Sequence, residues 1–139
     1  MATPAPVSPA RTARIIHVAL AIPPVLFGSV IAILVARGEL PPAGNPMVHF
    51  ALVGVGLFLM LAGTLVAFRI PPRTGGETPD AYWGRSFPRA VVAWAMMEGG
   101  AFLTGFAGLF AGTLFYPVIG MVAFAALMLG FNPARISGG

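Results

Sequence analysis

The chain has 139 residues, of which 58% are hydrophobic and only 9% are charged, and its formal net charge is +4. A water-soluble domain carries about 25% charged residues, so eight basic and four acidic side chains are too few to cover its surface. The composition excludes an ordinary cytosolic enzyme, a nucleic-acid-binding protein and a disordered chain, and it predicts an integral membrane protein. Cysteine and lysine are both absent, which excludes disulfides, thiolate metal sites and lysine Schiff bases.

Four apolar runs follow a tail over residues 1–13, which is rich in Ala, Pro, Ser and Thr and is expected to be flexible. The runs cover residues 15–36, 47–68, 90–111 and 114–131. About 20 apolar residues cross a bilayer as a helix, so three runs fit comfortably and the fourth just fits. The first run is too long for a typical signal peptide, and we expect it to be retained. The predicted fold class is therefore all-α: a polytopic membrane protein with four transmembrane helices.

The links between the runs predict two helical hairpins. The first covers residues 14–68 and the second residues 90–132, with a cytoplasmic link over 69–89 and a C-terminal tail over 133–139. Seven of the eight arginines lie in the N-terminal tail, the long link and the C-terminus, and only Arg37 lies on the other side. The positive-inside rule then places both termini in the cytoplasm of a bacterium whose inner membrane holds the protein. Tyr82 and Trp83 in the link are expected to lie at the headgroup level.

The first and third runs show a short internal similarity. Residues 19–27 align with residues 95–103, and the pair Pro23-Pro24 then falls opposite the pair Gly99-Gly100. Both runs cross in the same direction, so a duplication would give a parallel repeat about an axis along the membrane normal. Chance similarity between two apolar helices is the alternative. Because prolines remove backbone donors and glycines permit close approach, we expect a packed waist at this depth.

A row of small residues follows in the third run. Its members are four residues apart: Gly100, Thr104, Gly108 and Gly112. Such a row lets two membrane helices pack backbone to backbone. The partner helix is open among the first run, the fourth run and another copy of the chain.

Glu98 is the one ionisable side chain well inside an apolar run. A carboxylate there costs at least ~2.5–3.5 kcal/mol on the insertion scale, so we expect Glu98 to be protonated. It is a candidate for binding a proton or cation. The structural alternative is a neutral acid that donates a hydrogen bond to carbonyl groups freed by Pro23 and Pro24.

His17 and His49 lie near opposite ends of the first and second runs, so they cannot clamp one haem between them. Either imidazole could ligate a haem or chlorin alone, and the competing interpretation is an interfacial histidine. No zinc spacing and no catalytic triad is present in the sequence. The sequence does not identify a cofactor.

The segment Ala-Met-Met-Glu-Gly-Gly-Ala-Phe at residues 95–102 resembles the carboxylate helix of the c-type proteolipids of rotary ATP synthases. It is more similar to uncharacterised bacterial four-helix membrane proteins whose third span carries an Ala-Leu-Leu-Glu-Gly-Pro-Ala-Leu-Phe type of motif. The resemblance implies that Glu98 is a proton-binding carboxylate. The chain departs from the proteolipids because Glu98 lies on the first helix of its hairpin rather than on the second.

The leading hypothesis is a non-enzymatic accessory or structural subunit of a larger membrane assembly. Its expected partners are other membrane subunits or copies of itself, together with lipids, and not nucleic acid. The first alternative is a proteolipid-like protein that binds or translocates protons through Glu98. The second is a haem- or pigment-binding helix bundle that uses His17 or His49.

Overall fold

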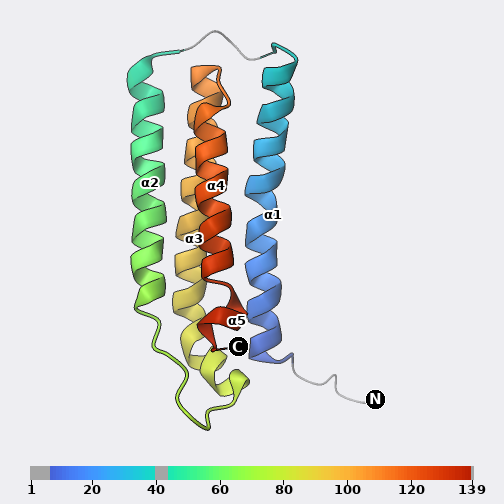
Figure 1. Cartoon of the computed structure of the whole chain (residues 1–139), viewed down its shortest axis with the longest axis vertical. Helices are drawn as coiled ribbons and strands as arrows, with labels where there is room; N and C mark the ends of the chain where they lie inside the picture. The colour runs from blue at the N-terminus through green and yellow to red at the C-terminus, as the bar shows by residue number, and fades with distance from the viewer. Residues whose placement is uncertain (1–6, 40–43, 139) are drawn as a thin grey trace.

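The computed structural model describes residues 7–39 and 44–138. Its elements are α1 (Pro9–Ala36), α2 (Pro46–Phe68), α3 (Pro79–Ala111), α4 (Phe115–Gly130) and the single turn α5 (Pro133–Ile136). These described residues contain no strand, and the predicted all-α class is confirmed. The helices stand side by side in one upright bundle (Figure 1).

Three of the helices, α1, α2 and α3, are long and apolar enough to cross a membrane. The shorter α4 has 16 residues, which corresponds to about 24 Å against a hydrocarbon core of about 30 Å. At 33 residues α3 extends over about 50 Å, so its first turns reach beyond the bilayer core. The chain is thus a helical membrane protein with three long apolar helices and a shorter fourth.

The central element is α3, which packs against α1, α2 and α4. Although α1 and α2 are consecutive in the chain, they make almost no contact with each other and lie on opposite sides of the bundle (Figure 1). The first predicted hairpin, residues 14–68, is therefore not a packed pair. The reason is that the close-approach surface of α2 faces α3 rather than α1.

That close approach is made by glycines. A Cβ atom added to Gly56 would lie 2.8 Å from the backbone oxygen of Gly100, and one added to Gly63 would lie 2.7 Å from that of Ala93. Real Cβ atoms do not come this near to a backbone oxygen, so α2 and α3 meet backbone to backbone. The seven-residue spacing of Gly56 and Gly63 places both on the α3 side of α2.

Several helices begin earlier than the apolar runs indicate. Residues 9–13, expected to belong to a flexible tail, form the first turn of α1, and Ala13 is fully buried; residues 1–6 of that tail lie outside the described residues. Residues 79–89 of the expected link belong to α3, and α5 occupies part of the expected C-terminal tail.

The signal that was missed is a cap residue followed by proline. The pairs are Ser8-Pro9, Asn45-Pro46, Thr78-Pro79 and Asn132-Pro133. Proline fits the first helical position because its missing N–H would have no partner there. Three of the caps accept a backbone N–H with their own side chain. Ser8 does not; instead Asp80 accepts hydrogen bonds from the Ala10 N–H, at 3.2 Å, and from the Ser8 hydroxyl.

The glycine contact gives a direct test. We expect Gly56→Ala to destabilise the bundle by about 1–3 kcal/mol, because the added methyl group meets the Gly100 carbonyl. Gly54→Ala is the matched control, since a Cβ there meets nothing within 4 Å. Both substitutions raise helix propensity equally. Equal unfolding free energies for the two variants in detergent micelles would contradict the α2–α3 contact.

Candidate functional site

Glu98 lies on the side of α3 that faces α1. It is one turn after Trp94 and one turn before Phe102, so the three side chains share a helix face. The Trp94 ring meets the His17 ring edge-on, with 4.8 Å between the ring centroids. The ring centroids of Phe102 and Phe27 are 5.3 Å apart. The carboxyl group is therefore placed at the α1–α3 seam, between two aromatic contacts, and it is half-buried.

The Glu98 carboxyl has no partner within the described part of the chain. The ion pairs there join Arg37 to Glu39 and Arg85 to Glu77, and no hydrogen bond reaches Glu98. The expected hydrogen bond to carbonyl groups freed by the proline pair is thus not formed. What remains is a polar group at mid-bundle depth whose hydrogen-bonding capacity is unused.

The proline pair and the glycine pair do not form a common waist. Helix α1 continues through Pro23 and Pro24, and Pro24 is buried. A Cβ on Gly100 would meet Gly56 and Met60 of α2, and a Cβ on Gly99 would come within 4 Å of Leu59 alone, also on α2. The glycines of α3 therefore serve the contact with α2, not one with the prolines of α1.

The small-residue row of α3 has more than one partner. Gly100 faces α2, whereas Thr104 is buried where it touches Gly120 of α4. Gly108 lies against Pro117 at the start of α4, and Gly112 ends α3 with a positive φ of 63°. Three of the four positions are buried in contacts within the chain, and the exposed Gly112 serves as the cap of α3, so the row is not a continuous surface for another copy.

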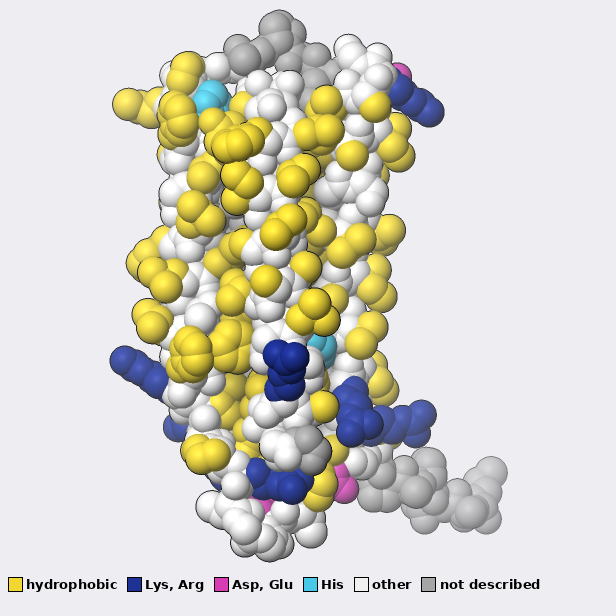
Figure 2. Space-filling view, viewed as in Figure 1, with side chains coloured by type: hydrophobic (Ala, Val, Ile, Leu, Met, Phe, Trp, Pro, Cys, Tyr) yellow, Lys and Arg dark blue, Asp and Glu magenta, His cyan; other side chains and the backbone are white. Residues whose placement is uncertain are grey.

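The two histidines lie at opposite ends of the bundle, as the sequence indicated (Figure 2). His49 is buried and packs against Phe50 and Tyr116, with centroid distances of 4.7 and 5.6 Å. The Nδ1 atom of each histidine is buried without a hydrogen-bond partner among the described residues. Only His17 lines a groove, together with residues of α1 and α4. Within the described ranges no three His, Asp or Glu side chains come together in a way that could hold a metal ion.

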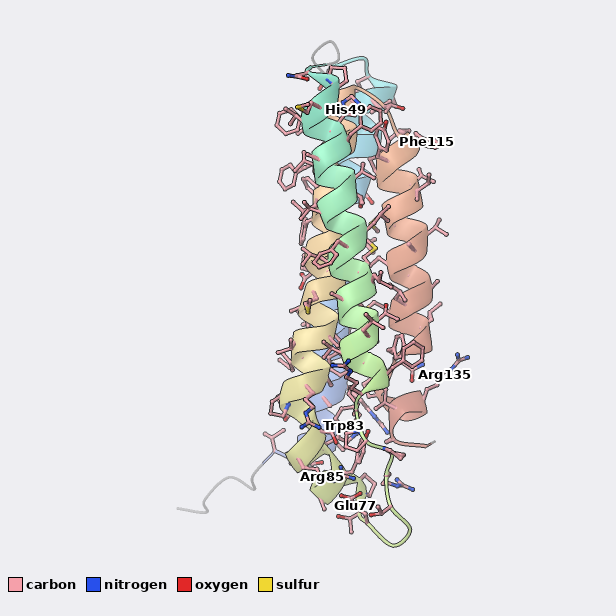
Figure 3. The ribbon with its side chains drawn as sticks, turned by 90° about the vertical axis from the view of Figure 1, so that its left-hand side faces the viewer. His49, Glu77, Trp83, Arg85, Phe115 and Arg135 are labelled. Carbon is pink, nitrogen blue, oxygen red and sulfur yellow. The ribbon has the colours of Figure 1, made fainter. Side chains whose placement is uncertain are left out.

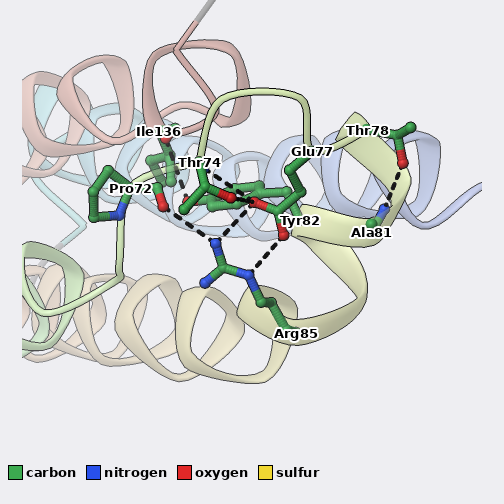
Figure 4. Close-up of polar contacts among 8 residues, drawn as sticks. All are labelled: Pro72, Thr74, Glu77, Thr78, Ala81, Tyr82, Arg85 and Ile136. Carbon is green, nitrogen blue, oxygen red and sulfur yellow. Dashed lines mark hydrogen bonds and ion pairs between the residues drawn. The ribbon is translucent and has the colours of Figure 1, made fainter.

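The end that carries both termini, here called the basic end, contains a clamp that sequence reasoning missed. Arg85 donates to both carboxylate oxygens of Glu77, at 2.8 and 2.9 Å, and to the Pro72 carbonyl at 3.2 Å (Figure 4). The backbone N–H of Thr74 also donates to Glu77. The Arg85 hydrogen bonds contribute most to lowering the pKa of Glu77 to about 2. The clamp folds residues 72–77 onto the first turns of α3.

Tyr82 and Trp83, expected at the headgroup level, face the interior of the bundle and not its surface. Both are buried, with 0% and 2% of their surface exposed. The Tyr82 hydroxyl donates to the Ile136 carbonyl at 3.3 Å (Figure 4), and the Trp83 ring packs against Trp94 with 6.1 Å between ring centroids. The aromatic residues thus form a core beneath α5 because α3 begins eleven residues before the apolar run and turns them inward.

Most arginines at the basic end are free of carboxylates. Arg85 is in the clamp, and the others are exposed with no ion pair among the described residues: Arg11, Arg14, Arg69, Arg73, Arg89 and Arg135. On the face shown in Figure 2, basic side chains gather at this end of the molecule, and the surface above them is largely hydrophobic. The basic end is therefore suited to an anionic environment.

No model of a known protein family, no curated protein and no solved structure matches the chain. The resemblance of the segment around Glu98 to proteolipids therefore stays a prediction.

The clamp predicts a pH dependence. The pKa of Glu77 is lowered from 4.5 to about 2, so the stabilisation by Arg85 is present above pH 4.5 and is lost as the pH falls towards 2. We expect the protein to melt at a higher temperature than Glu77→Gln near neutral pH, with the difference shrinking across that interval. Melting curves of both proteins in one detergent measure it. A difference that does not change with pH would show that Glu77 acts without its charge.

Proposed function

We propose that the protein is a non-enzymatic integral membrane subunit of a larger assembly, and that Glu98 contacts a neighbouring subunit. The observation that carries the proposal is the unpartnered, half-buried Glu98 carboxyl at the α1–α3 seam. Polar groups at membrane depth normally face a bundle interior and pair with another polar group. Because the described part of the chain supplies no such group, a side chain or backbone of a second subunit would complete the pair.

The packing of α1 supports the same proposal. Of the residues in an 18-residue apolar stretch of α1, only 11% are buried, against 50% in the corresponding stretch of α3. Large side chains outside the α1–α4 groove, such as Ile15, Val30 and Ile33, are exposed along it. A helix this weakly buried has surface available for another chain next to the seam that holds Glu98.

The proposed topology has four crossings and both termini in the cytoplasm of a bacterial inner membrane. The described ends of the chain lie at the same end of the bundle, which requires an even number of crossings (Figure 1). Seven arginines gather at that end and one lies at the other, in agreement with the positive-inside rule. The 16 residues of α4 cross a thinned bilayer or are extended by the flanking apolar residues.

A second candidate function is proton binding or translocation through Glu98, as the proteolipid resemblance implies. The same lack of a partner favours it, since a carboxyl group free of hydrogen bonds is available to exchange a proton. A hydrophobic carbodiimide should then label Glu98, and Glu98→Gln should abolish labelling. Absence of labelling at every pH tested would exclude this candidate.

Two substitutions separate the proposals. We expect Glu98→Leu to release companion subunits from the particle extracted in mild detergent, whereas Glu98→Gln retains them because an amide still forms hydrogen bonds. Native mass spectrometry shows which variant keeps its companion subunits. Glu39→Gln, at the end of the bundle opposite the basic end, is the control. If the wild-type protein leaves its own membrane as a monomer without companions, the subunit proposal is wrong. If both variants keep the particle and lose carbodiimide labelling, proton binding is favoured instead.

A further inference from the structure

An open groove runs along the outer surface between α1 and α4, on the side of α1 away from the Glu98 seam. Its part nearest the basic end has a volume of about 390 Å³ and is lined by His17, Ala21, Val25, Met128, Leu129 and Asn132, among others. A second hollow of about 290 Å³ continues it past Gly28 towards the opposite end, and Val25 lines both. The groove exists because α1 and α4 touch each other much less than either touches α3.

The groove near the basic end has the length of one lipid chain. From His17 to Leu26 the helix rises by about 14 Å, half of a hydrocarbon core of about 30 Å. Its lining is almost entirely apolar, and His17 and Asn132 are the two polar exceptions. Both of these lie at the end nearest the arginines, so the groove is polar where a headgroup would sit and apolar where an acyl chain would sit.

Two arginines flank the polar end. Arg14 lies four residues before Val18 and seven before Ala21, so it shares the groove-facing side of α1. Arg135 follows Asn132, whose side-chain oxygen accepts the Arg135 backbone N–H at 3.0 Å. The Arg135 side chain points away from the bundle at the end of α4 (Figure 3), and Arg135 also lines a separate hollow with Arg73. Both guanidinium groups are exposed and have no carboxylate partner among the described residues.

We propose that this groove binds one anionic phospholipid, with an acyl chain along α1 and α4 and the phosphate held by Arg14 and Arg135. Guanidinium groups recognise phosphate oxygens through paired charge-assisted hydrogen bonds. Basic pockets between membrane helices on the cytoplasmic side are a known type of anionic lipid site. A zwitterionic lipid would leave the two positive charges uncompensated, so the site selects lipids with net negative charge. This proposal does not depend on the role of Glu98, which lies on the α3 side of α1.

The test measures lipid bound to the full-length protein in detergent by native mass spectrometry. Phosphatidylglycerol and phosphatidylcholine are titrated separately. We expect the wild-type protein to prefer phosphatidylglycerol, and the double variant Arg14→Gln/Arg135→Gln to bind it about tenfold more weakly or worse. The matched control is Arg69→Gln/Arg89→Gln, which removes the same charge from two exposed arginines that line neither the groove nor the hollow beside Arg135. Ala21→Trp, which fills the groove without changing charge, should also weaken binding.

Several results would overturn the proposal. Equal weakening by the two double variants would indicate attraction to the basic end as a whole. Equal binding of the two lipids would exclude a phosphate site selective for anions, and displacement of phosphatidylglycerol by millimolar inorganic phosphate would indicate a soluble anion. A photoreactive residue at position 129 that cross-links to another protein in native membranes, instead of to lipid, would show that a subunit fills the groove. Melting temperatures of all variants separate lost binding from lost folding.

Discussion

The close contact between the backbones of α2 and α3 sets the arrangement of the whole bundle. Lipid tails are as apolar as leucine, so helices in a membrane associate through packing and hydrogen bonds and not through the hydrophobic effect. Gly56, Gly63 and Gly100 let two helices meet without side chains between them. The glycine surface of α2 faces α3, and α2 makes almost no contact with α1. Helix α3 therefore becomes the centre on which α1 and α4 pack.

The sequence predicted the all-α class of the protein, because that class follows from composition and hydropathy. It did not predict which helices touch, since hydropathy does not distinguish a side chain that faces lipid from one that faces a neighbouring helix. Glu98 could be placed at mid-membrane but not at the α1–α3 seam. The early start of α1 could not be predicted from the local sequence, because Asp80, the carboxylate that caps this helix, is 72 residues away from Ser8. The burial of Tyr82 and Trp83 was not predicted, because the apolar run begins after these two residues.

Helix α1 brings the two proposals together. One of its sides meets α3 at the seam with Glu98, and another forms the groove with α4. Its outward side chains are exposed along most of its length. The interior of the bundle is by contrast filled by aromatic and small residues such as Trp94, Phe124 and Thr104. Contacts with other molecules are accordingly expected around α1, while α2 and α3 supply a fixed support.

The dependence of α1 on Asp80 has a consequence for biosynthesis. A ribosome completes α1 44 residues and α2 12 residues before it reaches Asp80, and domains form as the chain emerges. During that interval the first turn of α1 has no carboxylate to accept the Ala10 N–H, and α1 and α2 have little surface in common. The first two helices must therefore wait in the translocon or in lipid as separate segments. Arrival of α3 gives α2 its glycine partner and completes the cap of α1, so one helix assembles both of its predecessors.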